Sequence, residues 1–273
     1  MKRLLGVLVI LFLVVFSLNA QVYQQVPNAG TVNWQDQLIR STGIGAPNPN
    51  MPLAAQRAGA LEAGKRVALR NLLETVKGMS ITSETTVENA MVQSDLIQTR
   101  VEGIVRNFRV VDTRYMSDGS VEVEVEIPLS GVLLDALLPQ MGVPMAPGQG
   151  IPGFQAMPQN VVYTGLIIDA RGIGARPAMA PKVLDEQGNE VYGTGFVSRE
   201  YAVQIGVVGY EKDINRARSN ERVTNNPLVV KGIKASGTNK NDVVISTADA
   251  QMVMNAAKNL NFMENCKVMV ILD

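Results

Sequence analysis

Two patterns of apolar and polar residues predict the main elements of the first half of the chain. Between residues 51 and 77, apolar residues recur at steps of three, four and seven, which is typical of one face of a helix. Asn50 can cap this helix, Pro52 suits its first turn and Gly78 can end it. The apolar stripe consists of Ala54, Ala58, Leu61, Ala68, Leu69, Leu72, Leu73 and Val76. The small residues Ala55, Gly59, Ala63 and Gly64 would let another backbone approach one side of the helix closely.

Residues 108–129 have the pattern of a β-hairpin. Two extended runs flank Ser117–Ser120, where Asp-Gly supplies the positive φ angles that tight hairpins need. After the turn, four apolar residues alternate with three glutamates, which predicts one buried face and one acidic, hydrated face. The apolar residues are Val121, Val123, Val125 and Ile127, and the glutamates are Glu122, Glu124 and Glu126.

Weaker patterns surround these two elements. Residues 34–46 read as a strand followed by a turn, and residues 79–87 as another strand. Residues 89–105 fit either a short helix or the entry to a strand, and residues 130–139 fit a short helix.

A stretch rich in Pro and Gly, residues 137–160, divides the chain. It carries no charge, and its composition does not fit the interior of a helix or sheet. The predicted organisation is therefore a first domain over residues 34–138, a linker over 139–160 and a second domain over 161–273.

The second domain mixes helical and strand patterns. Residues 161–172 read as a buried strand, residues 181–193 as a hairpin turning at Glu186–Asn189, and residues 266–273 as a final strand. Ser246 can cap a helix, with Asp249 placed to answer it. Hairpins mixed with helices favour an α+β fold of two small domains over a doubly wound sheet.

The N-terminal 20 residues have the layout of a secretory signal. Lys2 and Arg3 precede an apolar run that is short for a bilayer span, and Ala20 precedes a polar segment. We expect a cleaved signal peptide at 1–20, with an uncleaved anchor as the alternative, and a polar linker at 21–33. Because no cysteine lies near the expected cut, we expect no lipid anchor at the new N-terminus.

Composition narrows the function classes. The chain has 25 basic and 25 acidic residues, no histidine and one cysteine. Near-neutral charge argues against a nucleic-acid-binding protein, and the lack of histidine removes histidine bases, Ser-His or Cys-His pairs and imidazole zinc sites. We expect no catalytic residue, no cofactor and no metal, and we expect Cys266 to be a small buried residue.

Gly43-Ile-Gly45 begins like a dinucleotide-binding motif but does not complete it. Asn48 stands where a third glycine would be needed, and Pro47 and Pro49 lack the amide hydrogens that bind a pyrophosphate. The glycines are expected to permit a bend between a strand and the long helix. Gly-Ile-Gly-Ala recurs at residues 172–175, and an internal duplication is one interpretation of the repeat.

Candidate contact residues flank the second copy of this motif. Asp169, Arg171 and Arg176 could contact a ligand or partner, or an Asp-Arg pair could simply steady a surface turn. Glutamates 122, 124 and 126 lack the turn that a calcium loop needs, so a hydrated sheet face is favoured. A carboxylate-based hydrolase has candidate residues without diagnostic spacing: Asp169, Asp185, Glu186 and Glu200.

The ordered series of elements in the first domain resembles a known family. "IRSTGIGAPNPN", "AAQRAGALEAGKRVALRNLLETVKG", "ITSETTVEN" and "DGSVEVEVEIPL" are similar to the LPP-type envelope lipoproteins and to related domains of flagellar assembly proteins P and T. The resemblance implies a βαββ-type module with one long helix on an antiparallel sheet. It also implies an exported, non-enzymatic protein of the periplasm or outer-membrane periphery. Some members form or support rings and disks, so self-association or envelope partners are expected.

The chain departs from this family in lacking the lipid-bearing cysteine and in carrying a second domain. The resulting hypothesis is an exported structural or assembly protein of the bacterial envelope, with a flagellar role as one form of it. The alternative is a periplasmic module that binds a small ligand through the second domain.

Overall fold

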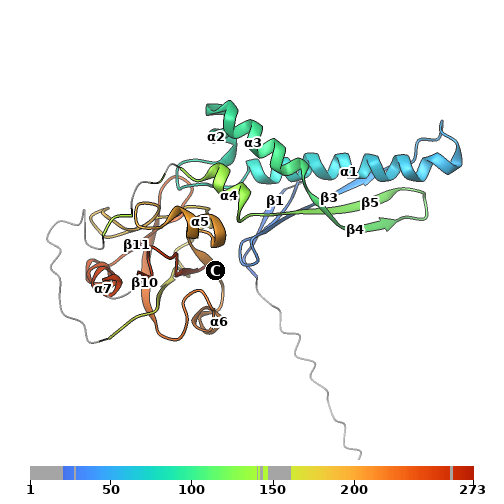
Figure 1. Cartoon of the computed structure of the whole chain (residues 1–273). Coiled ribbons are helices and arrows are strands. Elements are labelled where there is room, and N and C mark those ends of the chain that lie inside the picture. The colour runs from blue at the N-terminus through green and yellow to red at the C-terminus, as the bar shows by residue number, and fades with distance from the viewer. Residues whose placement is uncertain (1–20, 28, 140, 142–143, 147–160, 259–260) are drawn as a thin grey trace, which may run out of the picture.

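The computed structural model describes residues 21–27, 29–139, 141, 144–146, 161–258 and 261–273. The expected signal peptide at 1–20 lies outside the described residues, as does most of the expected linker. Two sheets form the body of the protein, and the first extends with a long helix into an arm (Figure 1). None of the described helices is both long enough and apolar enough to cross a membrane.

The first sheet is antiparallel throughout, with the strand order β1-β2-β3-β5-β4. The long helix α1, Leu53–Lys77, covers β3 and β5. This is the helix-on-antiparallel-sheet arrangement that the sequence predicts, and the α+β fold class is confirmed. The strands are β1 (Tyr23–Val26), β2 (Gly30–Asn33), β3 (Leu38–Gly45), β4 (Arg109–Tyr115) and β5 (Val121–Pro128).

Both glycines of Gly43-Ile-Gly45 lie inside β3, so the expected bend at this point is wrong. A Cβ atom at Gly43 would overlap the backbone of Gly64 and Ala68 in α1, and one at Gly45 would overlap Ala60 and Gly64. The strand backbone therefore runs directly beneath the helix backbone. The close approach expected at Gly64 is correct, and the glycines of β3 are its partners.

Three further predictions for the first domain need correction. The expected linker at 21–33 instead contains the strands β1 and β2. The side chains of Val22 and Val32 are buried in the core and hold this segment against the sheet. The expected strand at 79–87 is a tight loop with one isolated bridge, Ser80 to Thr86. Helix α1 begins at Leu53 after Pro52, whose fixed φ starts the helix, and Asn50 does not cap it.

Residues 89–105 are helical. Thr86 caps α2, Val87–Gln93, and Ser94 caps α3, Asp95–Arg106, each side chain accepting from a backbone N–H three residues on. Both helices rise away from α1, while the short α4, Val132–Leu137, closes the domain (Figure 1).

The predicted hairpin is confirmed. Strands β4 and β5 pair antiparallel, Gly119 has φ +85°, and Asp118 accepts hydrogen bonds from the amide and hydroxyl of Ser120. The apolar residues of β5 face α1 and are buried.

The second sheet has seven strands in the order β8-β7-β11-β10-β6-β12-β9. β10 and β12 pair parallel with β6, β9 pairs parallel with β12, and β7 pairs parallel with β11. The pairs β7–β8 and β10–β11 are antiparallel. The strands are β6 (Gly165–Asp169), β7 (Val183–Leu184), β8 (Glu190–Tyr192), β9 (Gly209–Glu211), β10 (Pro227–Ser236), β11 (Asp242–Ile245) and β12 (Val268–Ile271). The helices are α5 (Arg199–Ile205), α6 (Ile214–Arg218) and α7 (Thr247–Ala257).

Local predictions for the second domain are confirmed where side chains determine the backbone. Ser246 accepts from the Asp249 amide and donates to its carboxylate, which is the predicted helix cap. Asp185 accepts from the amides of Gln187 and Asn189 and so fixes the predicted β7–β8 turn.

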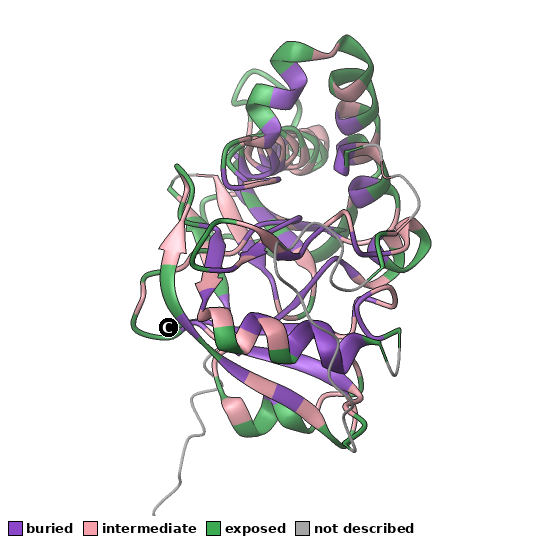
Figure 2. Ribbon diagram, turned by 90° about the vertical axis from the view of Figure 1, so that its left-hand side faces the viewer, coloured by how far each residue is buried: buried purple, intermediate pink, exposed green. Residues whose placement is uncertain are grey.

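The two domains are packed against each other. Ser83 donates to Asp242 at 2.5 Å and Gln37 donates to the Ile205 carbonyl at 2.7 Å, while one hydrophobic cluster runs through both domains. Trp34 and Tyr210 meet edge to face with ring centroids 5.6 Å apart. Buried positions in Figure 2 follow the strands and the helix faces that meet them, whereas the outer faces of the helices are exposed.

Candidate functional site

Asp169 and Arg171 lie where β6 ends and its loop begins. The Arg171 Nε atom donates to Asp169 Oδ1 at 2.8 Å and its Nη2 atom to Oδ2 at 2.6 Å. The hydrogen bonds from Arg171 hold the pKa of Asp169 below its usual value, and they outweigh the effect of partial burial. The Asp273 carboxylate accepts from the Gly172 amide in the same loop. Both carboxylate oxygens of Asp169 are thus bonded to Arg171, and the pair stabilises a turn at the surface.

Arg176 lies apart from this pair, on the wall of a hollow of about 460 Å³ at the junction of the two domains. Its amide donates to the Lys240 carbonyl, and its own carbonyl accepts from Asn241 Nδ2 at 2.9 Å. The first domain contributes the edge strand β1 and the end of α1 to the same hollow. Of the three residues that the sequence singled out, Arg176 is the one that lines this hollow.

The junction hollow is lined by groups of both charges. Lys212 and Asp273 join Arg176 in its wall, together with several amides and hydroxyls. Asn241 is 3% exposed and gives both amide hydrogens to carbonyls, yet its Oδ1 atom accepts no hydrogen bond among the described residues. A buried acceptor without a donor is costly, and because this atom is itself buried it is a local cost of the junction.

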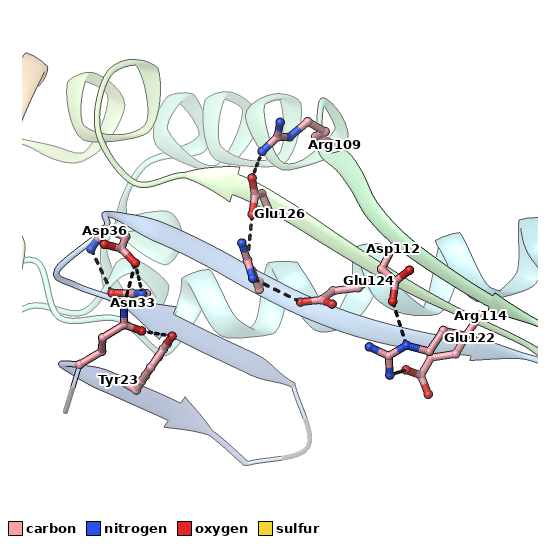
Figure 3. A network of polar contacts seen from close by, with 11 residues as sticks. Tyr23, Asn33, Asp36, Arg109, Asp112, Arg114, Glu122, Glu124 and Glu126 are labelled. Carbon is pink, nitrogen blue, oxygen red and sulfur yellow. Dashed lines mark hydrogen bonds and ion pairs between the residues drawn. The ribbon is translucent and has the colours of Figure 1, made fainter. Parts of the chain in front are cut away.

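The outer face of the first sheet carries a ladder of paired charges, shown in Figure 3. Arg40 on β3 donates to Glu126 at 2.8 Å and lies 3.8 Å from Glu124, while Arg109 at the start of β4 donates to the second oxygen of Glu126. Arg114 bonds Glu122 at 2.9 Å and also pairs with Asp112 on its own strand.

The expectation of a purely acidic, hydrated face is therefore wrong at Glu126, which is 3% exposed. Burial opposes the charge of this carboxylate, but hydrogen bonds from Arg109 and Arg40 hold its pKa below the usual value. The reason is cross-strand pairing, which places Arg40 and Arg109 beside Glu126 and Arg114 beside Glu122. Glu124 lies opposite Thr42 and Asp112, and Arg40 reaches it diagonally. Each carboxylate of the ladder already has a cationic partner, and such paired groups stabilise a sheet without forming an acid–base pair.

The sequence did not predict a buried cluster in the second domain that is formed by Arg222 and Cys266. Arg222 donates to the backbone carbonyls of Ile205, Gly206 and Cys266, and thereby ties the end of α5 to the loop before β12. Burial lowers the pKa of Arg222 and raises the pKa of the Cys266 thiol to about 12. Cys266 is fully buried, as predicted, and it would be protonated and unreactive at neutral pH. Nothing in the local sequence around Arg222 distinguishes it from a surface arginine.

Among the described residues, no group of three or more Cys, Asp or Glu side chains is arranged to hold a metal ion. Three of the four carboxylates considered for hydrolysis are engaged in separate structural contacts. Asp169 pairs with Arg171, Asp185 accepts hydrogen bonds that fix a turn, and Glu186 accepts hydrogen bonds from Thr247. Glu200 is exposed on α5.

Two family models match the chain. Residues 42–128 match the LPP20 lipoprotein family, which confirms the LPP-type resemblance of the first domain. Residues 165–273 match the second domain of Treponema pallidum Tp0624, so the second domain also has a family counterpart. No curated protein matches the chain. The relationship to flagellar assembly proteins P and T stays a prediction.

Proposed function

We propose that this protein is an exported, non-enzymatic structural or assembly component of the bacterial cell envelope. The observation that carries the proposal is the match of residues 42–128 to the LPP20 lipoprotein family. Residues 165–273 match the second domain of Treponema pallidum Tp0624, which gives the rest of the described chain a bacterial counterpart as well. A flagellar role is one form that this function could take.

The chemistry of the described residues supports a role in binding rather than in catalysis. The carboxylates on the first sheet are each paired with arginine, and the one thiol is buried with a raised pKa. What the molecule exposes instead is an extended arm of α1, β3, β4 and β5, with two helices rising from it (Figure 1). An extended surface built from regular helices and strands is suited to contacts with other folded proteins.

The proposal predicts self-association of residues 21–273. Sedimentation velocity over a range of protein concentrations would measure it, and the sedimentation coefficient should rise with concentration toward that of a defined oligomer. A protein that stays monomeric at the highest concentration, with no envelope partner recovered by cross-linking, would contradict the proposal.

A ligand-binding module is the alternative, and the junction hollow is the observation in its favour. Arg176 and Lys212 offer positive charge there, beside the carboxylate of Asp273. Under this alternative, an amino acid or short peptide should raise the melting temperature, and Arg176→Ala should remove that gain. Arg171→Ala is the matched control because Arg171 pairs with Asp169 outside the hollow. No gain from any such compound would exclude the alternative.

A further inference from the structure

A hollow with an apolar floor lies between α1 and α3. It measures about 290 Å³, and the half-buried side chains of Leu69 and Leu73 form its floor together with the buried Val105. Leu69 and Leu73 are one helical turn apart on α1, while Val105 comes from the last turn of α3. We call this hollow the α1–α3 groove.

Three arginines rim the α1–α3 groove: Arg66 and Arg70 from α1 and Arg106 from α3. The single acid in its lining is Glu102, which lies 3.7 Å from Arg106. Within the described residues, Arg66 and Arg70 form no ion pair, although the charge of Glu62, which bonds Lys65, also acts on Arg66; both arginine side chains are exposed. The groove therefore combines apolar surface with an excess of positive charge, and it fits an occupant that is apolar and acidic.

The corner where α2 meets α3 has the opposite character. Val92 is 81% exposed and Leu96 is 60% exposed, which is unusual for two large apolar residues on neighbouring helical turns. Glu88 and Asp95 lie beside them, also exposed. Residues 78–99 contain no lysine or arginine, so nothing local neutralises these carboxylates. We call Glu88, Val92, Asp95 and Leu96 the α2–α3 knob.

We propose that the α2–α3 knob of one copy of this chain docks in the α1–α3 groove of a second copy. The apolar residues of the knob would cover Leu69 and Leu73, and its carboxylates would face Arg66 and Arg70. This complementarity of charge and polarity selects a second copy over an unrelated partner. The inference rests on the proposed assembly function and names the surfaces that serve it.

The contact must form between copies, because the knob cannot reach the groove of its own chain. The knob sits at the start of α3 and the groove at its end, and α3 spans twelve residues. At 1.5 Å per residue the two surfaces are about 16 Å apart along a rigid helix. Both surfaces therefore stay open in one copy, and each copy offers one of each to its neighbours.

Charge reversal tests the contact in both directions. Arg66→Glu with Arg70→Glu makes the groove acidic, and Glu88→Arg with Asp95→Arg makes the knob basic. Each double variant of residues 21–273 should self-associate on the order of a hundredfold more weakly than the unchanged chain, because like charges would then face each other. An equimolar mixture of the two variants should regain association, since each reversed surface then meets an opposite charge.

The control reverses two positive charges elsewhere: Lys231→Glu with Lys234→Glu on the exposed side of β10. This variant has the same change in net charge as the groove variant and should associate like the unchanged chain. Circular dichroism and urea unfolding would show that all variants are folded, which is expected because the replaced side chains are exposed.

The outcomes separate this contact from the general proposal. If the unchanged chain associates and both double variants associate equally well, the knob and groove are wrong while assembly stands. If both variants are monomeric and their mixture stays monomeric, the pairing of these two surfaces is overturned. If the unchanged chain is monomeric, the contact between knob and groove is overturned, and the general proposal then stands only if cross-linking recovers an envelope partner. Binding to anionic lipid vesicles that is lost only in the groove variant, with association unchanged, would assign the groove to lipid and overturn the inference.

Discussion

The segments 43–46 and 172–175 share the residues Gly-Ile-Gly-Ala but use their glycines for opposite reasons. In the first domain Gly43 and Gly45 have ordinary strand conformation, and they are needed because α1 passes too close for a Cβ atom. In the second domain Gly172 and Gly174 have φ +79° and +67°, and no other part of the described chain lies within 4 Å of an added Cβ. One pair of glycines provides space and the other provides backbone freedom, so identical residues do not indicate a duplicated structure.

The ion pairs beside the two segments differ in the same way. Arg40 on β3 reaches the buried Glu126, which also bonds Arg109. Asp169 and Arg171 form their pair on the surface of a loop. The first region is held by tertiary packing and the second by local geometry, so substitutions should have unequal effects in the two.

The largest effect is expected from Gly45→Val. Its side chain would overlap the backbone of Ala60 and Gly64, so α1 must move off the sheet, at a cost of about 3 kcal/mol or more in the free energy of unfolding. Urea unfolding followed by circular dichroism measures this cost. Gly59→Ala on the same helix is the control: its Cβ atom would make an ordinary contact with Met51 Sδ at 3.6 Å, and the change should be neutral or stabilising by up to about 1 kcal/mol. Equal costs for the two would remove the packing explanation.

A smaller effect, about 1–3 kcal/mol, is expected from Glu126→Gln, because two arginines lose a charged acceptor in a buried position. The change should also alter the pH dependence of stability. The pKa of Glu126 is lowered in the folded state, so its contribution is present above the unfolded pKa, near 4.5, and is lost as the pH falls through the folded pKa. Urea titrations below pH 5 should therefore show a shallower acid loss for the variant. Parallel curves would indicate that Glu126 is not the responsible group.

Gly174→Ala should cost about 1 kcal/mol, which is the strain of a left-handed backbone for a residue with a Cβ atom. No steric overlap adds to it, since the site is open. Gly174→Asn should cost less than alanine, because asparagine tolerates this conformation better. Thermal unfolding of both variants measures the difference, and an alanine cost as large as that of Gly45→Val would erase the contrast between the two segments.

The smallest effect is expected from Arg171→Ala. Its ion pair with Asp169 is solvent-exposed, and such pairs contribute about 0–1 kcal/mol. The melting temperature should change little and the shift should shrink further in 1 M salt. A large drop in melting temperature that does not depend on salt would mean that Arg171 makes a contact beyond its exposed ion pair.

Much of the fold follows from local sequence. The periodic apolar stripe predicts α1, Asp118-Gly119 predicts the β4–β5 turn, and Ser246 with Asp249 predicts the start of α7. Each of these signals lies within a few residues of the structure it specifies, which is why it can be read along the chain.

The rest depends on contacts between distant residues. The polar segment 21–33 becomes two strands only because β3 is there to pair with, and residues 79–87 form a loop because the second domain engages them through Ser83. Gly43 and Gly45 cannot be distinguished from turn glycines until α1 is placed over them. Of the candidate contact residues, the Asp169–Arg171 pair is local and predictable, whereas the hollow beside Arg176 requires both domains.

Cross-linking in the native envelope fraction tests most directly whether the protein acts by assembly. A photoreactive residue placed at Leu96, on the exposed corner of α2 and α3, should give covalent products that contain a second copy of the chain, with the joined peptides spanning residues 66–73. The same probe at Met252, an exposed position on α7, should give none of these products. Recovery of the Leu96 variant only as an uncross-linked monomer, in an envelope fraction where the protein is abundant, would contradict the account.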